Sequence, residues 1–216
     1  MSVVPRWALL PAGGAPLFLI GGWTLAQAAQ PDGSDPVRQT ISALAATGAD
    51  HRWIMTVGLA GLGLCHLMTA LGLVTAAPAG RGLLALGGLA TLVLVAFPQR
   101  PGGSTTHVVA AGVAFGALAV WPALAVPRRA ALPLGQDDRH PPDRSAPRGP
   151  ARWAPLAVAA VLLGLLGWFA VEFFADGARI GLTERLLAAV EAAVPLAAVL
   201  TALACQRRRL EPSGPR

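Results

Sequence analysis

Long apolar stretches alternate with short polar ones along the chain, and this pattern predicts the fold. Six stretches meet or approach the about 20 apolar residues that a helix needs to cross a bilayer. The runs are long and lack a two-residue alternation, so they predict helices rather than a β-barrel. We therefore expect an all-α polytopic membrane protein, a bundle of six transmembrane helices. The predicted spans are residues 7–29, 53–77, 82–98, 107–127, 152–174 and 184–205.

A short segment between the first two spans, residues 36–46, has a different pattern. Asp35-Pro36 is typical of a helix start, with a capping carboxylate followed by proline at the first helical position. Thr47-Gly48 is typical of a helix end. We expect a short amphipathic surface helix of about three turns, too short to span, which lies on the extracytoplasmic surface or in the mouth of the bundle. Its apolar positions at helical spacing are Val37, Ile41, Leu44 and Ala45.

Residues 128–151 are rich in proline, arginine and aspartate and have too few apolar side chains to build a core. This composition predicts a disordered linker. The linker divides the chain into a four-helix part, residues 1–127, and a two-helix part, residues 152–205, followed by a basic tail at 206–216.

Composition and charge support the membrane interpretation. Charged residues make up 13% of the chain, against about 25% in soluble domains. All 17 basic residues are arginine, a usage typical of GC-rich bacterial genomes, and they cluster between the apolar runs. The net charge of +6 therefore indicates membrane topology and not nucleic-acid binding.

The arginines divide unequally between the two predicted sides, with 12 on one side and 5 on the other. Because positive residues stay in the cytoplasm, we expect both termini and the linker there, in a multi-pass protein of the bacterial cytoplasmic (inner) membrane. Tryptophans near predicted span ends agree with these boundaries; they are Trp7, Trp23, Trp53, Trp121 and Trp153. One alternative stays open: the first span also resembles a secretory signal, with cleavage near Ala29.

Scarce polar and ionisable residues gather on the predicted extracytoplasmic side. There they could form a polar cluster that binds the head group of a membrane lipid or another small amphiphile. The candidate ligand-binding residues are Asp35, Arg38, Ser42, Arg100, His107, Glu172, Asp176, Glu184, Arg185 and Glu191.

Glu191 stands out because it lies two turns inside the last span. It is seven residues from Glu184, so the two carboxyls share a helix face. Pro195 removes the backbone bond to the carbonyl of Glu191 and predicts a kink there. Ionisable groups at membrane depth are functional candidates by default. The alternative is that Glu191 pairs with an arginine and only ties helices together.

Metal and cofactor sites are not expected. His66 beside Cys65 suggests a haem ligand, but one histidine at depth is not a ligand set, and His107 lies too near the outer surface to match it. We expect His66 to be neutral and hydrogen-bonded between helices. Cys65 and Cys205 both lie in apolar runs and support neither a disulfide framework nor a zinc site.

Three stretches of the chain together resemble a bacterial family of six-helix membrane proteins, domain of unknown function 998. They are "DPVRQTISALAATGADHRWIM", "LGGLATLVLVAFPQRPGGSTTHVVAAGVAF" and "TERLLAAVEAAVPLAAVL". The resembling motifs fall on Asp35, Ile41 to Ala45, Phe97-Pro98 and His107. Where relatives often carry an acid after Phe-Pro, this chain has Gln99-Arg100. The resemblance implies six helices and an outer polar cluster, and it implies no activity.

Three hypotheses about function follow. The first is a non-enzymatic membrane protein that binds a lipid or amphiphile at its outer mouth. The second is an intramembrane enzyme acting on a lipid or isoprenoid by acid–base chemistry, with Glu191, Glu172 and His107 as the candidate catalytic residues. The third is a proton-coupled transporter. The sequence favours them in this order and leaves the oligomeric state open.

Overall fold

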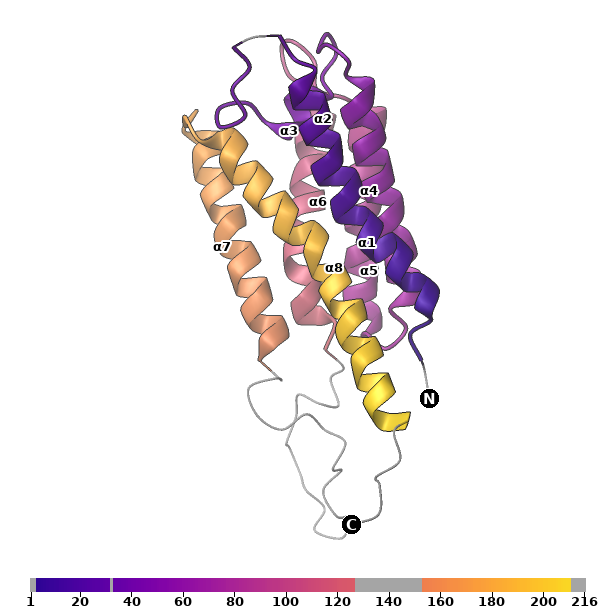
Figure 1. Cartoon of the computed structure of the whole chain (residues 1–216). Coiled ribbons are helices and arrows are strands. Elements are labelled where there is room, and N and C mark those ends of the chain that lie inside the picture. The colour runs from indigo at the N-terminus through magenta and orange to yellow at the C-terminus, as the bar shows by residue number, and fades with distance from the viewer. Residues whose placement is uncertain (1–2, 32, 127–152, 211–216) are drawn as a thin grey trace.

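The computed structural model describes residues 3–31, 33–126 and 153–210, and within them every regular element is a helix (Figure 1). Six helical stretches of this described part are long and apolar enough to cross a membrane. The first stretch combines a 3-10 turn, two α-helices and a π-helical turn. The elements are η1 (Arg6–Ala8), α1 (Leu9–Pro16), η2 (Leu17–Gly21), α2 (Gly22–Ala28), α3 (Ile41–Leu44), α4 (Trp53–Gly72), α5 (Pro78–Ala96), α6 (Thr105–Leu124), α7 (Ala154–Phe174) and α8 (Ile180–Leu210).

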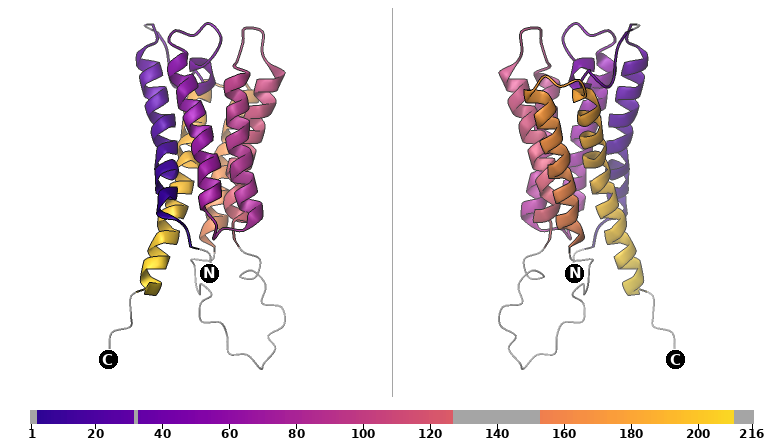
Figure 2. Two further views of the ribbon diagram at one scale, coloured as in Figure 1. Left: turned by 90° about the vertical axis from the view of Figure 1, so that its right-hand side faces the viewer. Right: turned by 90° about the vertical axis from the view of Figure 1, so that its left-hand side faces the viewer.

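The long helices form a ring in the order in which they occur along the chain. Each of α1, α4, α5, α6, α7 and α8 packs on the next, and α8 closes the ring on α1. Helix α8 also contacts α4 and α6, and it crosses the bundle obliquely in Figure 1. The two ends of the bundle differ (Figure 2). We call them the α3 end, which carries α3 and the α5–α6 and α7–α8 connections, and the terminal end, where the first stretch begins and α8 ends.

The extents of the helices follow local signals. Helix α5 starts at Pro78, where the missing N–H costs no intrahelical hydrogen bond. Helix α6 is capped by Ser104, whose hydroxyl accepts the backbone N–H of His107 at 3.3 Å. Helix α8 extends beyond the predicted span 184–205 at both ends. The predicted disordered linker, 128–151, and the tail from residue 211 onward lie outside the described residues.

The short helix α3 is present between the first two spans, but it is one turn long instead of three. Its cap is Thr40, whose side-chain oxygen accepts the N–H of Ala43 at 3.2 Å. Asp35 caps a separate turn instead, because its carboxylate accepts the N–H of Val37 at 2.8 Å. Ile41 and Leu44 are buried, so α3 is tucked into the mouth of the bundle.

Glycines allow α4, α5 and α6 to approach one another closely. A Cβ at Gly63 would lie 2.8 Å from the carbonyl oxygen of Gly88, and a Cβ at Gly88 would lie 2.7 Å from that of Gly63. A Cβ at Gly87 would meet Leu118 of α6 at 2.6 Å. Small residues at such contacts are the usual means by which helices pack in membranes. The Gly87-Gly88 pair therefore faces two neighbours at once.

The first stretch changes its winding in the middle. Pro16 ends α1 and lacks the N–H that would continue the α-helical ladder, and the wider π-helical turn η2 follows it directly. This turn carries the carbonyl of Phe18 against Gly58 of α4, where a Cβ would come within 2.8 Å of the oxygen. It also directs Leu19 into the core, where that side chain is 1% exposed.

Apolar side chains also cover the outside of the ring, as expected for a lipid-facing surface. Helix α7 is the least covered of the six spans, with Val161 and Val171 exposed on it. Trp121 differs from its prediction as an interfacial residue. Although it lies near the end of α6, it is 2% exposed and packs in an apolar cluster with Leu84.

Candidate functional site

The N-terminal turns of α8 hold the connection between α2 and α3 against the bundle. Gly181 makes this possible, because a Cβ there would overlap the backbone carbonyl oxygens of Pro36 and Gln39. The N–H of Leu182 donates to the carbonyl of Val37 at 3.1 Å. The start of α8 and residues 36–41 therefore form one packed unit at the α3 end.

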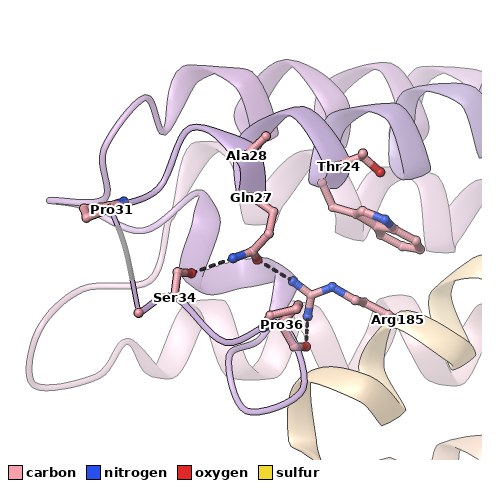
Figure 3. A pocket seen from close by; sticks show the side chains of 9 residues that line it. Thr24, Gln27, Ala28, Pro31, Ser34, Pro36 and Arg185 are labelled. Carbon is pink, nitrogen blue, oxygen red and sulfur yellow. Dashed lines mark hydrogen bonds between the residues drawn. The ribbon is translucent and has the colours of Figure 1, made fainter.

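Arg185 donates four of the hydrogen bonds that hold this unit together (Figure 3). Its Nη1 donates to the carbonyls of Pro36 and Gln39, both at 2.7 Å, and to that of Gly181 at 3.1 Å. Its Nη2 donates to Oε1 of Gln27 on α2 at 3.2 Å. Gln27 in turn donates to Ser34 at 2.6 Å. One guanidinium thus links α8, the connecting loop and α2.

An open pocket of about 550 Å³ lies next to this guanidinium. One wall comes from α2, a second from the loop that follows it, and Arg185 of α8 lies opposite α2 (Figure 3). The volume is in the range of pockets that take small organic ligands. We call it the outer pocket; its lining residues are Trp23, Thr24, Gln27, Ala28, Pro31, Gly33, Ser34, Pro36 and Arg185.

Glu184 points in a different direction from its neighbour Arg185. It is 3% exposed, and its carboxylate accepts the N–H of Ile41 at 2.5 Å and the hydroxyl of Ser42 at 3.4 Å. The carboxyl satisfies a backbone donor in the first turn of α3, where helices leave N–H groups free. Glu184 therefore fixes α3 over the interior of the bundle.

Beneath α3 lies a second and much smaller cavity of about 40 Å³, which we call the inner cavity. Five of its lining side chains are polar: Ser42, His66, Thr91, Glu184 and Glu191. They come from α3, α4, α5 and α8. The remaining lining side chains are apolar and include Leu19, Phe115 and Leu118. The shared face predicted for Glu184 and Glu191 is present, since both line this cavity.

Two of these polar groups are fully buried without a hydrogen bond inside the described part of the chain. Glu191 is 1% exposed and its Oε1 has no partner there, and His66 is 0% exposed with both ring nitrogens unpartnered. The expectation that His66 bonds between helices is therefore wrong for the described residues. An ion pair of Glu191 with an arginine is also absent from them. Helix α8 continues as a helix through Pro195.

The other predicted site residues do not line either pocket. His107 is buried, and its Nδ1 lies 3.1 Å from the carbonyl oxygen of Phe97. Glu172 accepts the N–H of Arg179 at 2.9 Å and so shapes the α7–α8 turn, which also contains the exposed Asp176. The three groups required by the enzyme hypothesis, Glu191, Glu172 and His107, do not meet in one cavity.

The remaining predicted charges lie on the surface of the α3 end. Asp35 and Arg38 form an exposed pair at 3.5 Å, which contributes little to stability. Arg100 is exposed on the α5–α6 connection. Neither the pair nor Arg100 reaches the outer pocket or the inner cavity.

Sequence reasoning missed several residues that build the two pockets. Trp23, Thr24, Gln27 and Ser34 of the outer pocket lie in or after the first span, and the glutamine and serine were the available signals. His66 and Thr91 of the inner cavity are single polar residues in apolar helices. These residues become recognisable as candidate site residues only in the folded structure, where the ring of helices places them around the same cavity as Glu191.

A closed ring of apolar helices, with apolar side chains outside and two pockets that contain some polar side chains toward one end, defines a polytopic α-helical membrane protein. The model of the family described as protein of unknown function (DUF998) matches residues 12–201. The chain belongs to this family, which confirms the resemblance seen in its sequence. Neither the curated proteins nor the solved structures contain a match to the chain.

Proposed function

We propose that this membrane protein binds a lipid or another amphiphile with an anionic head group, and that the head group lies in the outer pocket. The observation that carries the proposal is the open volume of about 550 Å³ beside the guanidinium of Arg185. A mouth filled by side chains would have argued against any such ligand.

The position of the outer pocket suits a ligand that comes from the bilayer. Helix α2 packs on α4 and α3, whereas α8 packs on α7 and, nearer the terminal end, on α1. The pocket lies where α2 and α8 separate. Exposed apolar side chains flank its lining residues, Leu25 on α2 and Leu186 on α8. An acyl chain could follow these apolar faces while the head group stays at the level of Trp23, a residue type that prefers the interface.

The electrostatics favour an anion. Arg185 donates to three backbone carbonyls and one side-chain amide, all of which are neutral acceptors. Glu184 and Asp35 are near enough to interact with its charge, but among the described residues no carboxylate forms an ion pair with it. A phosphate or carboxylate in the pocket would supply the missing counter-ion, and the hydroxyl of Thr24 adds a hydrogen-bond donor, whereas that of Ser34 already donates to Gln39 at 2.7 Å.

The distribution of arginines suggests on which side of the membrane the outer pocket opens. We infer that the terminal end, with Arg6 and Arg207 to Arg209, faces the cytoplasm of a bacterial inner membrane. The outer pocket then opens on the extracytoplasmic side. The ligand on this proposal is a lipid of the outer leaflet or an amphiphile that passes through it.

The test compares an anionic lipid with a zwitterionic one. Purified full-length protein in detergent micelles is titrated with phosphatidylglycerol and with phosphatidylcholine of identical acyl chains, and bound lipid is counted by native mass spectrometry. We expect phosphatidylglycerol to bind about tenfold more tightly, which corresponds to about 1.4 kcal/mol.

Ala28→Phe fills the outer pocket without removing any of the hydrogen bonds around Arg185. We expect this variant to weaken phosphatidylglycerol binding about tenfold. The matched control is Ala160→Phe, the same change at an exposed position on α7. Equal binding of the two lipids, or equal loss in both variants, would show that the outer pocket does not select an anionic amphiphile.

A further inference from the structure

The inner cavity contains groups that the proposed binding of an amphiphile does not use. Glu191 from α8 and His66 from α4 both face it, both are at least nine-tenths buried, and within the described residues neither Oε1 of Glu191 nor either ring nitrogen of His66 has a hydrogen-bond partner. Buried polar atoms in proteins are almost always hydrogen-bonded, to the protein or to ordered water. Three such atoms around one cavity therefore indicate that something polar belongs in it.

The size of the inner cavity restricts which polar molecule can occupy it. About 40 Å³ is far below the several hundred Å³ of ordinary ligand pockets, but it is enough for water. No group of three metal-binding side chains is found among the described residues, so a bound metal ion is not indicated. A cavity of this size, lined by a carboxyl and an imidazole, therefore suits water molecules that exchange protons with these two groups.

We propose that Glu191 and His66 form a proton-exchange site inside the membrane domain, connected by water in the inner cavity. In one state the carboxyl of Glu191 is protonated and His66 is neutral. In the other state the carboxyl has given its proton to a water molecule, that water has given one of its own protons to a ring nitrogen of His66, and the pair is a carboxylate and an imidazolium. The net charge of the pair is zero in both states, which keeps the cost of burial low compared with an isolated charge.

Only one other titratable group lines the cavity, Glu184 on the same helix. The lining residues from the other elements packed against Glu191 are not titratable; they include Leu19 of η2, Thr91 of α5 and Phe115 of α6. The carboxylate of Glu184 is already engaged by the N–H of Ile41 and the hydroxyl of Ser42. Ser42 is only half-buried and lines the cavity, so it marks the route by which protons reach the pair from the α3 end.

Infrared difference spectroscopy tests this directly. Full-length protein is reconstituted in phosphatidylcholine vesicles, and spectra of unlabelled and glutamate-labelled protein are compared at one mildly alkaline pH, where exposed carboxyls are ionised, in water and in deuterium oxide. We expect a protonated-carboxyl band that moves to lower frequency in deuterium oxide and on labelling with 13C-glutamate. The labelling needs no substitution, so the absence of any glutamate carboxyl band from the wild-type protein is enough to overturn the proposal.

Variants then assign the band. Glu191→Gln should remove it, and Glu191→Asp should keep a carboxyl band at a shifted position, whereas Glu172→Gln, at the α7–α8 turn outside the cavity, should leave it unchanged. His66→Gln keeps a polar side chain but takes no proton, so it should change the position of the band. A band that survives Glu191→Gln, or that His66→Gln leaves unaltered, refutes the exchange between the two groups. Lipid binding at the outer pocket is measured separately, so either proposal can fail alone.

Discussion

The contact between Gly181 and the α2–α3 loop gives the sharpest prediction about stability, because two effects of Gly181→Ala oppose each other. Alanine stabilises a helix by about 1 kcal/mol relative to glycine. Against this, the new Cβ would overlap the carbonyl oxygens of Pro36 and Gln39 and push the loop away. Arg185 would then lose both of its 2.7 Å bonds to these oxygens, and Leu182 would lose its bond to Val37.

The magnitudes decide the sign. Hydrogen bonds to a charged donor contribute about 1.5–3 kcal/mol each, and those at a partly exposed site fall at the low end. Losing this set, two bonds to Arg185 and one neutral backbone bond, costs about 3–4 kcal/mol, which exceeds the helical gain and leaves a net loss of about 2–3 kcal/mol in the local stability of the loop. That loss corresponds to roughly 30- to 150-fold more frequent opening.

Hydrogen–deuterium exchange followed by mass spectrometry measures this opening. Peptides that contain Ile41 should exchange faster in Gly181→Ala by the factor given above, since the N–H of Ile41 is protected by Glu184. The control is Gly164→Ala on α7, where a Cβ would meet no atom within 4 Å. Unchanged or slower exchange at Ile41 in Gly181→Ala would refute the assigned role of this contact.

Three further predictions concern other parts of the chain. Gly63→Val should destabilise the bundle by about 1–3 kcal/mol, because the new valine side chain meets the carbonyl of Gly88 and the side chain of Leu92. Gly116→Val, whose side chain meets open space, is the control, and unfolding in mixed micelles of increasing sodium dodecyl sulfate compares the two variants. Glu184→Ala should lower stability by about 1–3 kcal/mol in the same assay, because it leaves the N–H of Ile41 buried without an acceptor, and a change below 0.5 kcal/mol would contradict this. In intact cells a membrane-impermeant maleimide should label an introduced Thr47→Cys at the exposed α3 end but not the native Cys205, and the reverse pattern would overturn the proposed orientation.

The six spans could be predicted because the hydrocarbon of the bilayer sets a length and a polarity that are read directly along the chain. The length of α3 could not be predicted in this way. Its apolar spacing suggested three turns, but Thr40 has extended backbone angles, φ −67° and ψ 158°, so the helix begins only at Ile41. The preceding carbonyls of Pro36 and Gln39 accept from Arg185, which is more than 140 residues away in sequence. A local periodicity contains no information about such a partner.

The predicted polar cluster is divided in the structure, and helix geometry explains the division. Neighbouring residues on an α-helix point about 100° apart. Glu184 therefore reaches Ile41 and the inner cavity, while Arg185 reaches the loop and the outer pocket. The sequence grouped the two by their predicted side of the membrane, but the side alone does not tell which way a side chain points around the helix.

The inner cavity and the close helix contacts have a common origin. Gly88 brings α5 so near to α4 that a Cβ there would lie 3.1 Å from the Cβ of His66 as well as 2.7 Å from the carbonyl of Gly63. The backbone of α5 thus covers the stem of His66 and leaves its ring facing the cavity. On the other side, the π-helical turn after Pro16 places Leu19 against the same space. Close approach of α4 and α5, and the widened turn of the first span, together explain why a histidine and a glutamate share a small enclosed cavity in an otherwise apolar bundle.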